Sequence, residues 1–277
     1  MLVAFATIPA KPDQANEDFV AATTDAVVLL DGAGTPVGSE SGCIHGVTWF
    51  VRQLGTALLS SLTTSDDPDL VQCLAASIRE VHALHVDTCD LAHPGSPSAT
   101  VAALKAREHA LDYLVLGDSV LVLDLPEELR VVSDDREARI GRRLRAKMDA
   151  LPNGTPEHDQ AYREYVEQLR AHRNQPGGFG VASTEPEAAQ HALTGSVPRA
   201  QVRTAALFSD GASRLVDRFG LATWEDALKV LDTLGPSELL RKVREAENSD
   251  PSGSRWPRGK AFDDATVACC SVNDHPI

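Results

Sequence analysis

The feature that most constrains the fold is the sorting of strand-like and helix-like segments into separate blocks. Between Ser98 and Val132 the chain consists of short runs rich in Val, Leu and Ala, with turn residues between them. Residues 45–62 and 69–89 instead carry apolar side chains at helical spacing. A parallel sheet would require strands that alternate one by one with helices, and this order does not provide them. The sequence therefore predicts an α+β layered domain.

The individual elements are expected from the same patterns. The four runs between 99 and 132 predict an antiparallel meander, and the two amphipathic segments predict a helix pair packed on a sheet. The long charged segment 136–173 has a composition typical of helices and is interrupted at 151–154. We therefore expect an inserted helical hairpin over the sheet. Expected strands are 1–7, 26–30, 99–105, 110–116, 120–125, 129–132, 202–209 and 265–272, and further expected helices are 224–232 and 236–248.

The charge balance narrows the range of partners. The 277 residues carry a formal net charge of −14, the sequence pI is about 5.0, and 43% of the residues are hydrophobic. Nucleic-acid binding requires a basic stripe, and the Arg-rich segment 136–147 is interleaved with Glu, so we expect no nucleic-acid partner. Because an acidic surface repels anions at long range, a phosphate site must bring its own positive charge.

Cysteine and histidine spacing gives no familiar metal signature. The five cysteines, at positions 43, 73, 89, 269 and 270, form no C-x-x-C pair and no Cys/His zinc spacing, and the nine histidines show no H-x-x-x-H. We expect reduced cysteines with structural roles in a cytoplasmic protein. The first ten residues lack a basic n-region, and no run approaches the ~18 apolar residues of a membrane span, so we expect neither export nor membrane insertion.

Acidic residues recur at the ends of the apolar runs. If the strands share sheets, these carboxylates converge, and they need a compensating cation because close carboxylates cannot all ionise. Oxygen-only ligands suit Mg²⁺ or Mn²⁺, and two such ions about 4 Å apart can bind a phosphoryl group and activate water. Asp-Gly after a strand is also a common turn, so spacing alone leaves the turn alternative open. The acidic positions beside apolar runs are Asp31-Gly32, Gly117-Asp118, Asp210-Gly211 and Asp263-Asp264. A further acidic pair, Glu17-Asp18, follows the first loop.

Taken in order, these motifs resemble those of the metal-dependent PPM family, the type-2C serine/threonine protein phosphatases. The resemblance spans nearly the whole chain. The matching elements are N-E-D at 16–18, V-L-L-D-G-A-G at 28–34, P-S-A-T-V-A at 97–102, L-G-D-S at 116–119, L-F-S-D-G at 207–211 and D-D-A-T-V at 263–267.

The resemblance implies a fold and an activity. It implies one PPM-type phosphatase domain over residues 1–277, an α-β-β-α sandwich of two antiparallel sheets flanked by helices, with a flap-like helical insert at about 134–176. It also implies hydrolysis of phosphoserine and phosphothreonine esters on protein substrates by a metal-bridged hydroxide. The implied cofactors are two Mn²⁺ or Mg²⁺ ions, with a third in some members, and the implied setting is cytoplasmic signalling.

The same resemblance assigns roles to individual residues. Asp31 would bridge the two metal ions, with Gly32 offering its carbonyl oxygen to one of them. Asp210 and Asp263 would complete the other ion's ligands, so Asp31, Asp210 and Asp263 are the expected catalytic residues. The outer positions, which hold metal-bound waters or in some members a third ion, are matched by Glu17, Asp18 and Asp118.

Several positions depart from the family pattern. Ala33 stands where many members have a histidine that can protonate the leaving group, and Asp13 stands where a phosphate-binding Arg is expected. Val120 replaces the usual Arg, and Asp264 replaces Asn. Lys11 is a nearby substitute cation, without the bidentate geometry of Arg. These departures keep a second function open, a PPM-fold regulatory or binding module with weak or no phosphatase activity.

The charged insert carries two open interpretations of its own. As a flap beside the cleft it would set substrate choice and supply an Arg to the phosphate. As a solvated helical hairpin it would do neither, which is the usual role of a charged helical run.

Overall fold

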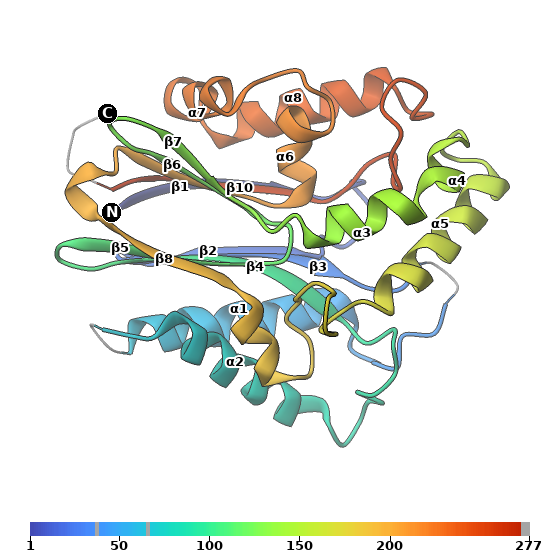
Figure 1. The fold of residues 1–277 in the computed structure, drawn as a ribbon, viewed down its shortest axis with the longest axis horizontal. Helices are drawn as coiled ribbons and strands as arrows, with labels where there is room; N and C mark the ends of the chain where they lie inside the picture. The colour runs from blue at the N-terminus through green and yellow to red at the C-terminus, as the bar shows by residue number, and fades with distance from the viewer. Residues whose placement is uncertain (37–38, 65–66, 273–277) are drawn as a thin grey trace.

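Two antiparallel five-stranded sheets lie face to face between two layers of helices (Figure 1). The computed structural model describes residues 1–36, 39–64 and 67–272. Sheet 1 contains, in spatial order, β1 (Leu2–Ile8), β10 (Ala265–Ser271), β9 (Thr204–Phe208), β6 (Val120–Asp124) and β7 (Leu129–Val132). Sheet 2 contains β2 (Asp18–Ala22), β3 (Ala26–Ala33), β4 (Ser98–Ala106), β5 (Ala110–Leu116) and β8 (Leu193–Pro198).

Helices cover the outer face of each sheet. Packed against sheet 2 are α1 (Gly46–Thr63) and α2 (Leu70–His85), and packed against sheet 1 are α6 (Asp210–Asp217), α7 (Trp224–Thr233) and α8 (Pro236–Ser249). The expected helices at 45–62, 69–89, 224–232 and 236–248 therefore match observed ones to within a few residues. The predicted α-β-β-α sandwich is confirmed.

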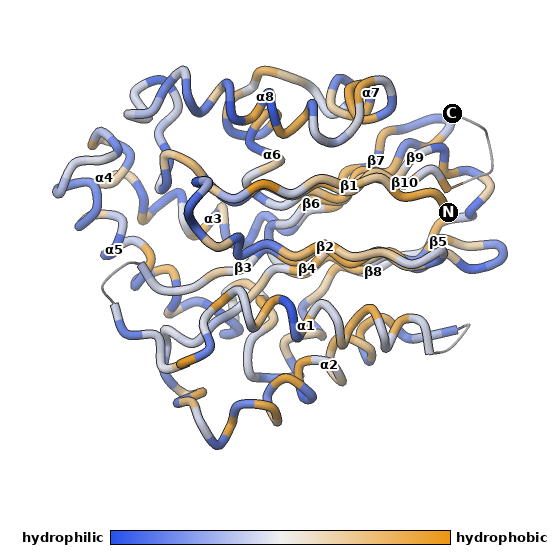
Figure 2. The backbone as a smooth tube through the Cα atoms, turned by 180° about the vertical axis from the view of Figure 1, so that it is seen from behind, coloured by the Kyte–Doolittle hydropathy of each residue, from blue (hydrophilic) through white to orange (hydrophobic). Residues whose placement is uncertain are grey.

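The apolar runs form strands with two buried faces. Along β3, Val27 and Leu29 point into the core between the two sheets, whereas Val28 and Leu30 point toward α1 and α2. Successive side chains alternate between the faces of a strand, so a central strand of this sandwich must be apolar at every position. Each fully buried Val or Leu contributes about 1.5–3 kcal/mol. In Figure 2 the hydrophobic colouring accordingly concentrates in the strands.

The predicted single meander over 99–132 is wrong. β4 and β5 pair in sheet 2, but β6 and β7 pair in sheet 1, so the chain changes sheets at 117–119. Gly117 allows the crossing, because its φ of +81° suits glycine and a Cβ there would lie 2.6 Å from Thr100 Cγ2. Local periodicity could not show this, since β6 pairs with the distant β9.

Among the strands and α-helices of the described residues, three were absent from the sequence prediction. β2 and β8 are the edge strands of sheet 2 and are only partly buried, so they lack the continuous apolar signal of the central strands. The third is α6, which begins at Asp210 directly after β9. Gly211 permits this sharp change of direction, since a Cβ there would lie 1.9 Å from the carbonyl oxygen of Asp264.

The charged segment lies at one end of the sandwich, on the right in Figure 1. It contains α3 (Arg136–Leu144), α4 (Ala146–Asp149) and α5 (Pro156–Arg170), with the break at the expected place between α4 and α5.

The single-domain assignment over 1–277 stays a prediction, and its last five residues, 273–277, lie outside the described part of the chain. None of the helices within the described ranges has the length and apolarity needed to cross a bilayer.

Candidate metal centre

The candidate site lies where strand ends of the two sheets meet. Asp31 belongs to β3 of sheet 2, and its register partner on the neighbouring β2 is Asp18. Asp210 follows β9 of sheet 1, and its backbone N–H donates a hydrogen bond of 3.0 Å to Asp31 Oδ2. The carboxylates of Asp18, Asp118, Asp210 and Asp263 all act on Asp31 electrostatically. The five separate acidic motifs therefore converge on one place.

Gly32 is required by the close packing behind Asp31. Its N–H donates to the carbonyl oxygen of Glu17 at 3.1 Å, and a Cβ at this position would lie 2.4 Å from that oxygen. The same Cβ would lie 2.5 Å from Val47 Cγ1 of α1. Because no larger residue fits, glycine here holds the N-E-D loop against the end of β3.

Unbalanced negative charge dominates the centre of the site. Burial raises the pKa of Asp18 to about 8; the carboxylates of Asp264, Asp210 and Asp263 add to the rise, and the Thr266 hydroxyl offsets part of it. Burial also raises the pKa of Asp31 well above its ordinary value, with Asp210 as the next contributor. Both carboxylate oxygens of Asp18 are buried and accept no hydrogen bond of normal geometry.

Asp263 has the opposite environment. Burial alone would raise its pKa, but Lys260 and Arg214 outweigh that effect and lower it. Lys260 Nζ lies 2.8 Å from Asp263 Oδ1, and the buried Arg214 of α6 pairs with Oδ2. Asp263 is therefore held ionised by two cations that the sequence analysis did not identify.

Two further acidic residues, Asp264 and Glu17, interact with the residues of the site. Asp264, expected to add charge beside the site, accepts hydrogen bonds from the N–H groups of Ala10 at 2.6 Å and Glu17 at 2.7 Å. It therefore ties the N-terminal loop to the start of β10. Glu17 itself has a pKa raised by burial, and its carboxylate interacts with Lys260 and Asp263.

Glu137 of α3 reaches the site from the insert and was missed. Burial raises its pKa to about 7; Arg173 lowers it, and Asp210 raises it further. Asp118 has a pKa well above its ordinary value because of burial and then of Glu137. No sequence pattern singled out Glu137, because it is one acidic residue in a charged helix.

Two further cations near the site, Arg170 and Arg173, come from the insert. Lys11 and Asp13, the positions where a phosphate-binding group was sought, are exposed on the N-terminal loop. Arg170 of α5 donates through Nη2 to the carbonyl oxygen of Gly34, at 2.5 Å. Arg173 interacts with Glu137 and Asp118, and the Nε atoms of Arg170 and Arg173 are both buried without a hydrogen-bond partner.

This set of residues fits hard divalent cations. All the converging donors are carboxylate or carbonyl oxygens, which Mg²⁺ and Mn²⁺ prefer. Clustered carboxylates in a buried site need compensating charge, and both oxygens of Asp18 are buried without a hydrogen bond of normal geometry. All seven positions expected to contact metal or its waters are brought together: Glu17, Asp18, Asp31, Gly32, Asp118, Asp210 and Asp263.

A second cluster, outside this site, was also missed. The sequence analysis expected only structural cysteines and histidines, yet the side chains of Cys43, His45, His85 and Cys89 converge. Each of its two halves is a mixed pair, Cys-x-His and His-x-x-x-Cys, which searches for C-x-x-C or H-x-x-x-H do not find.

Known proteins share this fold. The serine/threonine phosphatase Stp1 from Staphylococcus aureus is 12% identical, with 98% of this chain and 94% of that chain covered and a TM-score of 0.59. The serine/threonine phosphatase PstP from Mycobacterium tuberculosis is 19% identical, with 97% of each chain covered and a TM-score of 0.56. A PstP catalytic domain in complex with two manganese ions is also 19% identical, covering 97% of this chain and 96% of that chain, with a TM-score of 0.56.

Sequence comparison identifies the family directly. No curated protein sequence matches the chain. A family model described as protein phosphatase 2C matches residues 10–246, which is most of the chain. The chain therefore belongs to the protein phosphatase 2C family.

Proposed function

We propose that this protein is a phosphatase that hydrolyses phosphoserine and phosphothreonine esters on proteins with the help of two Mn²⁺ or Mg²⁺ ions. The observation that carries the proposal is the convergence of Asp18, Asp31, Asp118 and Asp210 on one buried site whose negative charge is uncompensated. Family membership and the two manganese ions of a PstP structure support it.

Each acidic residue has a defined task in this mechanism. Asp31 lies at the centre of the cluster and would bridge both ions, with the Gly32 carbonyl beside it. Asp210 and Asp263 would complete the second ion's ligands, and Lys260 and Arg214 keep Asp263 ionised for that purpose. Glu17 and Asp18 would orient bound waters. When bound, the divalent ions would polarise the phosphoryl group and lower the pKa of the attacking water.

Arg173 is the residue we propose to hold the substrate phosphate. It is the cation of the insert that interacts with both Glu137 and Asp118, and its buried Nε has no hydrogen-bond partner. A guanidinium can bind two phosphate oxygens at once, which matches its role at phosphate sites generally. The family's expected position is taken by the exposed Asp13 instead, so the positive charge would come from the insert.

The chain lacks the histidine that protonates the leaving group in many family members. Ala33 offers no proton donor at the position where many members have histidine. We propose that water protonates the departing serine or threonine oxygen. Because no side chain assists the departure, activity should be highest for substrates whose leaving group has a low pKa. This explains why an aryl phosphate is the better first probe of turnover.

The test is hydrolysis of p-nitrophenyl phosphate and of a phosphothreonine peptide by the full chain, with Mn²⁺ varied. Turnover should require Mn²⁺ and should be lost in Asp210→Asn, while Asp87→Asn, an exposed acidic residue on the α2 side, should leave it unchanged. No turnover at any Mn²⁺ concentration, from folded protein that binds the ion, would contradict the proposal.

That last outcome would favour the second function, a regulatory or binding module that keeps the fold. The specific observation in its favour is that position 13, where a phosphate-binding Arg is expected, is an exposed Asp. A module of this kind would bind a phosphopeptide without hydrolysing it, which a binding titration with the same peptide would show. In either case we place the protein in the reducing cytoplasm, because its cysteines carry free thiols.

A further inference from the structure

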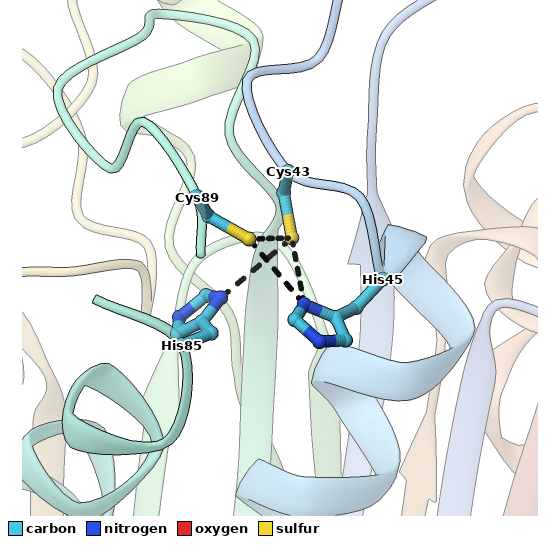
Figure 3. Close-up of side chains that lie close together, drawn as sticks. All are labelled: Cys43, His45, His85 and Cys89. Atoms are coloured by element: carbon cyan, nitrogen blue, oxygen red, sulfur yellow. Dashed lines mark hydrogen bonds between the residues drawn. The ribbon is translucent and has the colours of Figure 1, made fainter. Parts of the chain in front are cut away.

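Two thiols and two imidazoles point at one another beneath sheet 2. Cys43 and His45 lie just before α1, and His85 and Cys89 lie at and just after the end of α2 (Figure 3). One nitrogen or sulfur atom from each side chain lies within 4.8 Å of all the others. No residue of the cluster belongs to the carboxylate site.

Four of the six distances between the ligand atoms are close to the edges of a tetrahedron around zinc. Cys43 Sγ lies 3.5 Å from Cys89 Sγ, 3.8 Å from His45 Nδ1 and 3.6 Å from His85 Nδ1, and Cys89 Sγ lies 3.3 Å from His45 Nδ1. A tetrahedral zinc ion with Zn–S of about 2.3 Å and Zn–N of about 2.0–2.1 Å implies S···S edges near ~3.8 Å and S···N edges near ~3.5 Å. The four side chains already leave a space of that size between them.

Metal binding requires neutral imidazoles and deprotonated thiols. A cation bound between Cys43 and Cys89 would itself favour release of both thiol protons.

Backbone hydrogen bonds and one ring stack hold the cluster in place. The Ser41 hydroxyl donates to the carbonyl of Cys43, and the Gly42 carbonyl accepts from the N–H of Asp90 at 2.8 Å. The N–H of Cys89 donates to the His85 carbonyl at 3.0 Å, which places both side chains on one turn. Trp49 stacks on His45 with ring centroids 4.3 Å apart. A binding site held in place in this way loses little conformational entropy when it captures a ligand.

We propose that Cys43, His45, His85 and Cys89 form a second metal site, a closed Cys₂His₂ site for one Zn²⁺. Two thiolates and two imidazoles are a soft ligand set that favours zinc over the Mn²⁺ or Mg²⁺ of the carboxylate site. Because four protein ligands complete the tetrahedron, the site has no open position for a substrate and its role is structural. It would fasten the start of α1, which follows the Asp31-Gly32 segment, to the end of α2.

The first test is zinc content, measured by mass spectrometry on the full chain purified with a reducing agent and supplied with zinc. Wild type should retain roughly one equivalent after desalting, and Cys43→Ser and Cys89→Ser should lose most of it. Cys73→Ser is the matched control, because Cys73 lies on α2 but outside the cluster. Asp31→Asn should also retain its zinc, which separates this site from the carboxylate site and from the proposed phosphatase activity.

The second test uses wild type alone, so that misfolded variants cannot obscure the answer. Cobalt(II) added to metal-free protein should give a thiolate-to-cobalt charge-transfer band and the intense visible bands of tetrahedral cobalt. Zinc should displace both. Absence of the charge-transfer band, equal zinc content in Cys89→Ser and Cys73→Ser, or a Cys43–Cys89 disulfide found in place of metal would each overturn the proposal.

Discussion

The backbone N–H of Asp210 donates to Asp31 Oδ2 across 3.0 Å, although 179 positions separate the two residues in the chain. This bond joins the end of β9 in sheet 1 to the end of β3 in sheet 2. It therefore brings one acidic residue from each half of the sandwich into the same site.

The first prediction concerns these two residues. Asp31→Asn and Asp210→Asn should each lower kcat/KM on p-nitrophenyl phosphate by at least about a hundredfold, or about 2.7 kcal/mol, because each removes a charge that would hold the catalytic ions. The thermal midpoint in the absence of metal should stay close to wild type or rise. Activity within tenfold of wild type for both variants would show that the ions are held elsewhere.

The second prediction concerns Asp18, whose two buried oxygens have no hydrogen-bond partner. In excess EDTA, Asp18→Asn should be at least as stable as wild type, because the substitution removes an uncompensated buried charge. Adding Mn²⁺ should raise the melting temperature of wild type more than that of the variant. Thermal melts with and without Mn²⁺ measure both effects, and Asp87→Asn should behave as wild type. A variant that is less stable in EDTA and gains as much from Mn²⁺ would contradict the metal assignment.

The third prediction concerns the phosphate. Arg173→Ala should raise KM for a phosphothreonine peptide and weaken inhibition by inorganic phosphate, each by about tenfold or more, because a charge-assisted bidentate contact is lost. Arg173→Lys should recover only part of the loss, since an ammonium cannot bind two oxygens in the same way. Arg163→Ala, an exposed cation on α5, is the control. Equal kinetics in Arg173→Ala and Arg163→Ala would remove the insert from phosphate binding.

The fourth prediction concerns stability and pH, away from the metal centre. Asp250 pairs with the buried Arg258 at 3.0 Å and accepts from the N–H groups of Arg255 and Trp256. Burial opposes ionisation of Asp250, but the Trp256 and Arg255 N–H groups and Arg258 outweigh it and lower the pKa. A lowered carboxyl pKa contributes stability above the unfolded pKa of about 3.9, and this is lost as pH falls through the folded pKa.

Asp250→Asn should therefore cost about 3 kcal/mol at pH 7, since it leaves a buried guanidinium without its charged partner. The difference from wild type should be constant between about pH 5 and 8 and should shrink below about pH 4. Urea unfolding at several pH values measures it, with the exposed Asp232→Asn as control. A difference that persists unchanged at low pH would mean that the charge of Asp250 does not matter.

Much of this architecture was predictable because its central strands are apolar on both faces and its helices are amphipathic. Runs such as 26–30 and 265–272 could not be anything but buried strands, and the Asp residues at their ends are where two sheets can meet. Partner choice was not predictable, since nothing local distinguishes a β6 that pairs with β7 alone from one that also pairs with β9. The edge strands β2 and β8 were not predicted because they are half exposed and lack a continuous apolar run.

From the apolar runs alone, the site could be predicted only for residues that mark a strand end. Asp31, Asp118, Asp210 and Asp263 each stand beside an apolar run, so their positions carry a signal. Glu137, Arg173 and Lys260 lie in charged or polar segments where any of several residues could have turned inward. The approach of Cys43 to Cys89 depends on how α1 and α2 pack against each other. Residue spacing within the sequence does not show this tertiary contact.

The most direct test of the central claim is a crystal structure of the full chain grown with Mn²⁺, with anomalous scattering used to locate the ions. We predict two strong anomalous peaks about 4 Å apart, bridged by Asp31 and flanked by Asp210 and Asp263. Peaks elsewhere in the molecule, with these three carboxylates still bound only to protein groups, would contradict the account.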